Sequence, residues 1–208
     1  MTKIDIKPEE YNKLLDFINN EIRNKGLKAT TMDSIASSYR ISKRTLYEIF
    51  SNKDEMIEEA IAHWHSETSK EYSRIFSQSS NIMEAILGCF ILNRDIIGKT
   101  CPDFFRDFHD FAKKRHEISG KKRTHMYEHL MDILKKGVDE GYFRKDLNIP
   151  VQSQMITIQM ESLRRLEELF PENMTLIEVF DSIIFTFLRG NSTPKGIETL
   201  DALIKDLK

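Results

Sequence analysis

The sequence contains few of the residues that interrupt helices, and few cysteines. Its 208 residues include eight glycines, five prolines and two cysteines. Scarce helix breakers and a charged fraction of 31% favour a helical chain over a β-rich or disordered one. Cys89 and Cys101 lie in no paired motif and suit a reducing compartment, where thiols behave as small hydrophobic side chains. A redox switch is the less favoured interpretation of these cysteines.

Long apolar segments are also absent. No apolar run approaches the roughly 18 residues that a bilayer span requires. The first ten residues, MTKIDIKPEE, lack the apolar core of a signal peptide. These absences predict a cytoplasmic protein that does not bind a membrane.

The chain is rich in apolar residues at helical spacing. They predict a helix over residues 8–25 and two short helices over 32–38 and 43–50, the last two separated by a turn of about three residues. Thr31 and Ser42 directly precede the short helices and can cap them. Two short helices joined by so tight a turn predict a helix-turn-helix motif.

Basic residues are concentrated in this part of the chain. Residues 23–53 contain seven basic and two acidic side chains, although the whole chain has a net charge of −2. A basic strip suits a phosphate backbone, because each Lys or Arg that neutralises a phosphate releases counterions. A solvated basic surface explains the charge alone equally well. The helix-turn-helix pattern favours the interpretation as a DNA-binding surface.

The second short helix carries the residues best suited to contact DNA. Lys43 and Arg44 lie at the end that enters the major groove first, and Arg44 is the candidate for reading a base. Glu48 is predicted to pair with Arg44 four residues earlier, or else to accept from a cytosine amino group. Tyr47 can donate to a phosphate or pack against a helix. Hydroxyls, charge and helix N-terminal amides suggest phosphate contacts at four further residues, although capping alone explains the first two: Thr31, Ser42, Thr45 and Lys53.

The segment TTMDSIASSYRISKRTLYEIFSNKDEMI resembles the DNA-binding segment of the TetR family of bacterial transcriptional regulators. Two positions depart from the family pattern. Tyr39 and Arg40 stand where a glycine is usual, so either the turn differs or Arg40 adopts a left-handed conformation. Ile49 stands where histidine or tyrosine is common. The matching residues lie within about the first 60 residues: Thr31, Ile35, Ala36, Ser42, Lys43, Thr45, Leu46, Tyr47, Phe50 and Lys53.

The predicted fold is all-α. A three-helix helix-turn-helix domain at residues 1–52 is followed by a larger helical regulatory and dimerisation domain at 53–208. A connecting helix, capped by Ser51 or Asn52, is predicted over about 53–76.

Two long apolar helices are predicted over about 150–170 and 175–188. The resemblance implies that they pack against the same two helices of a second subunit, which gives a homodimer. Such a dimer is expected to bind a near-palindromic operator in double-stranded DNA. The expected interface residues are Met155, Ile158, Leu166, Phe180, Ile183, Ile184 and Phe187.

The resemblance also implies a small-molecule effector in the C-terminal part. An aromatic stripe could line a cavity for an apolar ligand, or could be plain core, which is the commoner case. His125 and His129 stand four residues apart and would bind a metal if a third ligand converged, but a solvent-facing pair is favoured. No metal or cofactor is therefore predicted. The candidate pocket residues are Phe104, Phe105, Phe108 and Phe111.

The sequence contains none of the local motifs sought for enzymes: a nucleophile elbow, a glycine-rich phosphate loop, a zinc-binding His-Glu pair or a dinucleotide fingerprint. An all-helical enzyme is the alternative class. The main prediction is a TetR-like transcriptional regulator, a repressor that a small molecule releases from its operator. An activator, or a regulator controlled by a protein partner, is the alternative within that class.

Overall fold

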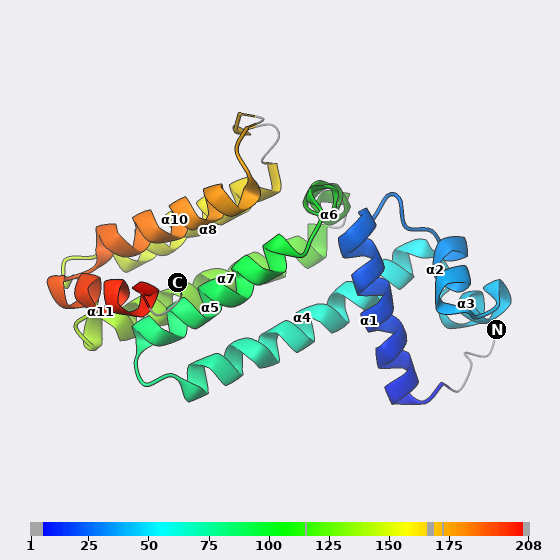
Figure 1. Cartoon of the computed structure of the whole chain (residues 1–208), viewed down its shortest axis with the longest axis horizontal. Coiled ribbons are helices and arrows are strands. Elements are labelled where there is room, and N and C mark those ends of the chain that lie inside the picture. The colour runs from blue at the N-terminus through cyan, green and yellow to red at the C-terminus, as the bar shows by residue number, and fades with distance from the viewer. Residues whose placement is uncertain (1–5, 115, 166–168, 172, 206–208) are drawn as a thin grey trace. The chain divides into compact units, whose positions relative to one another are not determined.

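The computed structural model describes residues 6–114, 116–165, 169–171 and 173–205, and helices joined by loops and turns make up this part of the chain (Figure 1). No strand occurs among the described residues, which show a single isolated bridge between Phe143 and Ser192. The predicted all-α fold is confirmed. In chain order the elements are α1 (Pro8–Lys25), α2 (Met32–Tyr39), α3 (Lys43–Ile49), α4 (Lys53–Gln78), α5 (Ile82–Gly98), α6 (Pro102–Lys114), α7 (His116–Asp139), α8 (Ile149–Ser162), the 3-10 helix η1 (Leu163–Arg165), α10 (Leu176–Asn191) and α11 (Pro194–Lys205).

The helices of the N-terminal part begin and end close to the predicted residues. Pro8 occupies the first turn of α1, and Gly26, at φ 84°, ends it by donating its N–H to the Ile22 carbonyl. α2 and α3 each differ from the prediction by one residue at the C-terminal end. Asn52, rather than Ser51, caps α4, because its Oδ1 accepts from the Glu55 N–H at 2.9 Å.

The chain divides into two compact units. The first contains the described residues through Ser73 together with Lys99–Asp107, and the second contains Arg74–Gly98 and the residues from Phe108 onward. α4 and α6 therefore each contribute residues to both units. The predicted end of the DNA-binding domain at residue 52 is a different division, and it stays a prediction.

The first unit has a core built from one face of each of its helices. The buried positions on α1 recur at three- and four-residue spacing, and those on α2, α3 and the start of α4 face them. This arrangement buries the two short helices on one side only, so their other side is available for a partner. The residues at most 1% exposed include Leu14, Ile18, Ile22, Ile35, Leu46, Phe50 and Met56.

The second unit has two adjoining apolar clusters. Phe90 of α5 and Phe180 of α10 stack with their ring centroids 5.4 Å apart and their planes 3° apart. Gly137 of α7 admits the Phe143 ring, since a Cβ at that glycine would lie 2.3 Å from it. The buried members of the clusters are Met83, Leu134, Phe143, Leu188 and Leu200 in one, and Leu87, Phe90, Leu163, Val179 and Phe180 in the other.

The long C-terminal helices depart from the predicted lengths. α8 ends at Ser162 and continues as the 3-10 turn η1, so the helix predicted over about 150–170 is interrupted at Leu163–Arg165. Residues 166–168 of the predicted helix lie outside the described residues. The sequence contains no glycine or proline between Pro150 and Pro171, so it carries no stop signal there. α10 is longer than predicted. It begins with a reciprocal cap between Thr175 and Glu178 and continues to Asn191.

Candidate DNA-binding surface

Hydroxyl caps set the starts of α2 and α3. The Thr31 hydroxyl accepts from the Ser34 N–H at 3.0 Å, and the Thr31 N–H donates to the Ser34 hydroxyl at 2.9 Å. The Ser42 hydroxyl accepts from the Thr45 N–H at 3.0 Å. Both predicted caps are confirmed. Thr31 and Ser42 are also exposed, so their hydroxyls can contact DNA while they cap.

The turn between α2 and α3 closes through a left-handed residue. Arg40 has φ 60° and ψ 40°, which is the conformation that the missing glycine would otherwise provide. Its N–H donates to the Ser37 carbonyl at 3.2 Å, and the Ile41 N–H donates to the Ala36 carbonyl at 3.0 Å. The turn therefore keeps its tight geometry without glycine. Of the two predicted alternatives, a different turn or a left-handed Arg40, the structure has the second.

The outward face of α3 is charged and highly exposed. The Arg44 side chain is 87% exposed, and its Nε donates to Glu48 Oε1 at 2.9 Å, which confirms the predicted pairing within the helix. The hydrogen bond to Glu48 and the charge of its carboxylate raise the pKa of the Arg44 guanidinium above its ordinary value. Lys43 Nζ donates to Asp33 Oδ2 at 2.6 Å, which ties α3 to α2. Both cations are thus held in place in the free protein.

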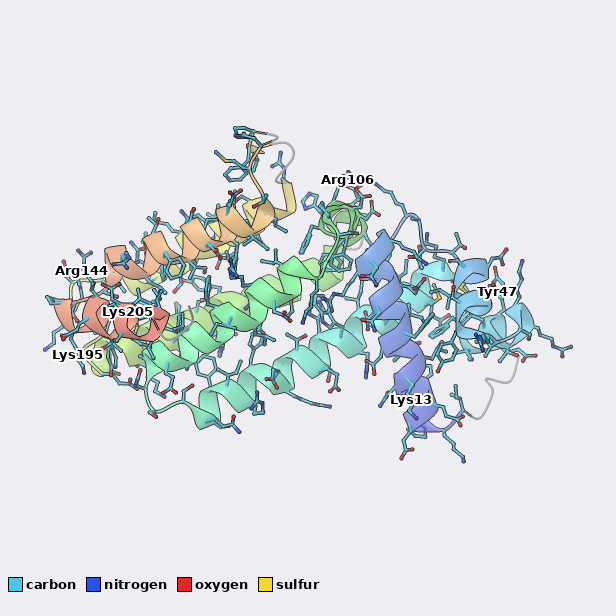
Figure 2. The ribbon with its side chains drawn as sticks, viewed as in Figure 1. Lys13, Tyr47, Arg106, Arg144, Lys195 and Lys205 are labelled. Atoms are coloured by element: carbon cyan, nitrogen blue, oxygen red, sulfur yellow. The ribbon has the colours of Figure 1, made fainter. Side chains whose placement is uncertain are left out.

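Tyr47 lies on the same face as these cations and is labelled in Figure 2. It is 46% exposed, and it has no ring or hydrogen-bond partner among the described residues. That exposure favours the phosphate-contacting interpretation over a packing tyrosine. Leu46, Ile49 and Phe50 on the opposite face are buried, so Ile49 serves the core at the position where the family often has a polar ring.

Thr45 and Lys53 are less exposed than the other candidates. Thr45 is half-buried, and its hydroxyl lies 2.8 Å from the Ser42 hydroxyl. Lys53 is half-buried, and its Nζ donates to the Lys28 carbonyl at 3.1 Å. Lys53 therefore ties the start of α4 to the segment between α1 and α2, a contact that the sequence pattern does not predict.

α6 and the two residues before it also bind α1 and the segment that follows α1. Asp107, 4% exposed, accepts from the Lys28 N–H at 2.8 Å. The Cys101 N–H donates to the Arg23 carbonyl at 2.8 Å, and Arg23 Nε donates to the Thr100 hydroxyl at 3.0 Å. No local pattern marks these residues, because they act through contacts with residues more than seventy positions away. They hold the segment that leads into the helix-turn-helix.

The predicted pocket residues fall into both units. Phe104 is buried and meets Trp64 edge-to-face at 6.0 Å and Phe105 at 5.5 Å, so it belongs to the core of the first unit. Phe108 and Phe111 are half-buried residues of the second unit. At Phe104 the structure favours the core interpretation. The ligand cavity stays a prediction.

The histidines and cysteines form no recognisable site in the described part of the chain. His129 is exposed and meets the Phe76 ring edge-on at 5.4 Å, while the side chain of His125 lies outside the described residues. No cluster of three potential metal ligands occurs where side chains are described. Both cysteines are free thiols, and burial raises the pKa of Cys89 to about 11, which disfavours the reactive thiolate.

The predicted interface residues differ in exposure. Met155 is 48% exposed and Ile158 is 55% exposed, and Val151, at 48%, adds to the same stripe of α8. Phe180 is only 4% exposed, because its ring packs inside its own protomer, so its assignment to an interface is corrected to the core. Leu166 lies outside the described residues. The three remaining residues are half-buried: Ile183, Ile184 and Phe187.

Two short capped helices with a tight turn, one face in the core and the other charged and exposed, define a helix-turn-helix DNA-binding protein. Residues 14–60 match the family model described as bacterial regulatory proteins, tetR family. This match confirms the predicted resemblance of the N-terminal segment to the TetR family of bacterial transcriptional regulators.

Similar proteins are regulators as well. The HTH-type transcriptional repressor KstR2 of Mycolicibacterium smegmatis is 27% identical over 153 residues, which cover 70% of this chain and 73% of that protein. The solved ketosteroid transcriptional regulator KstR2 of Mycobacterium tuberculosis is 21% identical, with a TM-score of 0.60 over 92% of this chain and 99% of that one. A TetR-family regulator from Marinobacter aquaeolei is 18% identical, with a TM-score of 0.70 over 97% and 98%. These two structures share the fold.

The helices in the described part of the chain are short or polar compared with a bilayer span. None of its helices is both long and apolar enough to cross a bilayer.

Proposed function

We propose that this protein is a dimeric repressor that holds a near-palindromic operator through α2 and α3 and leaves it when a small molecule binds. The exposed face of α3, with Lys43, Arg44 and Tyr47 outward and Leu46 and Phe50 buried, carries the proposal. The related KstR2 proteins are described as repressors, which supports repression over activation.

In the proposed complex the N-terminal end of α3 enters the major groove. Arg44 reads a base, since its guanidinium can donate two hydrogen bonds to guanine, and the contact replaces its pairing with Glu48. Lys43 and Tyr47 contact phosphates at the groove walls, and the caps add hydroxyls and free amides. The proposed DNA contacts are Thr31, Ser42, Lys43, Arg44, Thr45, Tyr47 and Lys53.

The proposed dimer forms through α8 and α10. Val151, Met155 and Ile158 recur at four- and three-residue spacing, so they form one apolar stripe on the outer surface of α8. α8 and α10 lie side by side in Figure 1 and contact each other. Two such pairs would make a four-helix interface that buries the stripe, and a two-fold axis would explain a palindromic operator.

The proposed effector is an apolar small molecule. The half-buried aromatic residues Phe108 and Phe111 of α6 support this choice, as does the description of the solved relative as a ketosteroid regulator. Such a ligand releases DNA only through its higher affinity for the form that cannot bind the operator.

Gel-shift and transcription experiments test the proposal. The protein should retard a small subset of genomic fragments, and adding it to transcription from those promoters should reduce transcript yield. Increased transcript would establish an activator, and the absence of any retarded fragment would contradict the DNA-binding role.

Phe108→Ala tests the effector site. Once a screen of apolar compounds, steroids included, has found a molecule that releases the operator, this variant should bind DNA normally and respond less to that molecule. A core role instead predicts a loss of about 3–5 kcal/mol in stability with an unchanged response. Melting temperature and operator release, measured on the same sample, distinguish the two.

A further inference from the structure

Arg40 differs from the other basic residues of the strip at 23–53. Its side chain is exposed and forms no hydrogen bond or ion pair with any described residue. Its neighbours in the strip are all engaged: Arg23 with Thr100, Lys25 with Glu21, Lys28 with Asp107, Lys43 with Asp33, Arg44 with Glu48 and Lys53 with the Lys28 carbonyl. Arg40 is thus the cation of this strip whose side chain forms no hydrogen bond or ion pair in the described part of the protein.

The backbone of Arg40 is in a conformation that disfavours its side chain. At φ 60° and ψ 40° it is the one described residue other than glycine with a positive φ. In this region the Cβ of an L-residue crowds the following carbonyl, so glycine is the default and asparagine is tolerated. A bulky residue kept in such a conformation points to a function for its side chain.

The position of Arg40 suits a phosphate contact. It lies two residues before Ser42, the cap of α3, and Lys43 follows directly. The guanidinium of Arg40 is a donor, and α2, which Arg40 ends, is the helix that crosses the DNA backbone in this motif. A guanidinium can donate two parallel hydrogen bonds to one phosphate.

We propose that Arg40 binds a DNA phosphate next to the start of α3, a contact independent of base sequence. This inference rests on the proposed operator binding. It explains why an arginine occupies the left-handed turn, and it adds one phosphate contact to each half-site.

Three substitutions distinguish the role of the Arg40 charge from that of its left-handed backbone conformation. Arg40→Gly and Arg40→Asn both accept the left-handed conformation and remove the charge, whereas Arg40→Lys keeps a charge in the same conformation. Melting temperature, and dissociation constants on operator and random DNA across a salt series, should be measured for all three and the wild type.

Removal of the charge should weaken DNA binding without loss of stability. Arg40→Gly and Arg40→Asn should melt at or above the wild-type temperature and bind operator and random DNA on the order of tenfold more weakly. The slope of log affinity against log salt should fall by about 1.8 for a dimer, or about 0.9 per lost phosphate. Arg40→Lys should keep most of the slope.

The results that would contradict the Arg40 contact differ from those that would contradict DNA binding itself. Wild-type affinity and slope in Arg40→Gly and Arg40→Asn would overturn the phosphate contact, as would a loss confined to the operator. If the wild type itself binds no DNA, the proposed function fails, and the Arg40 assignment fails with it.

Discussion

In the helix-turn-helix, core packing and partner binding fall on opposite faces of each helix, and these faces differ in polarity. In α8 and α10, the residues proposed for the dimer interface are apolar, as are most of the residues that pack in the core. On α3, Leu46 and Ile49 are buried while Arg44 and Tyr47 are exposed. On α10, Phe180 is buried in the protomer, but Ile183 and Ile184 beside it are half-buried. A polar exposed face can be distinguished from the buried face of its helix in the sequence alone. An apolar exposed face does not, because in the sequence it resembles core.

The largest expected effect separates core from interface on α10. Phe180→Ala should lower the free energy of unfolding by about 3–5 kcal/mol, because it removes the ring that stacks on Phe90. Thr186→Ala, at an exposed position of the same helix, should change it by less than about 0.5 kcal/mol. Chemical denaturation measures both. A mild effect of Phe180→Ala would return this residue to the interface.

The next effect concerns the exposed stripe of α8. Ile158→Glu would place an unpaired charge in the proposed dimer interface, so the dimer should dissociate at least a hundredfold more readily. Gln159→Glu adds the same charge one residue along, turned by about 100° around the helix, and should leave the dimer largely intact. Sedimentation over a concentration series compares them. Equal dimer stability in both variants would place the interface elsewhere.

A smaller effect separates base reading from phosphate binding at the DNA surface. Arg44→Ala should weaken operator binding on the order of tenfold to a hundredfold and relax the preference at one base pair in each half-site. Lys53→Ala should weaken all sequences alike and lower the salt slope by about one unit per half-site. Competition titrations against operator variants make the distinction. Equal losses on operator and random DNA for Arg44→Ala would end its base-reading role.

The smallest effect compares two similar caps. Thr31 begins α2 and Thr175 begins α10, and each forms a reciprocal cap with the residue three positions later. Thr31→Ala and Thr175→Ala should each lower stability by about 1 kcal/mol. Only Thr31→Ala should also weaken DNA binding, since only Thr31 lies at the proposed surface. If both variants bind DNA like the wild type, Thr31 is a cap and nothing more.

Much of the DNA-binding unit could be predicted from the sequence because its determinants are local. The starts of α2 and α3 follow from Thr31 and Ser42, and the Arg44 pairing with Glu48 follows from a four-residue spacing. The sequence also predicts that Lys53 begins a helix, but it does not predict the bond from Lys53 to the Lys28 carbonyl. That bond depends on how two segments distant in sequence come together.

The second unit was harder to predict because its determinants are not local. Phe180 has the same apolar character and spacing as the residues around it, and only its stacking on Phe90 of α5 identifies it as core. The end of α8 at Ser162 has no glycine or proline signal. In the first unit, Asp107 carries no local signal either, since its partner Lys28 lies seventy-nine positions earlier.

Selection of bound sequences from a random pool of double-stranded DNA tests the central claim most directly, because neither the operator nor the effector has to be identified first. A dimer that reads DNA with α3 should enrich two inverted copies of one half-site, with centres separated by about 34–36 Å or a multiple of it. The same selection with Arg44→Ala should lose one base preference in each copy. A pool that shows no enrichment, or a single site without inverted symmetry, would contradict the account.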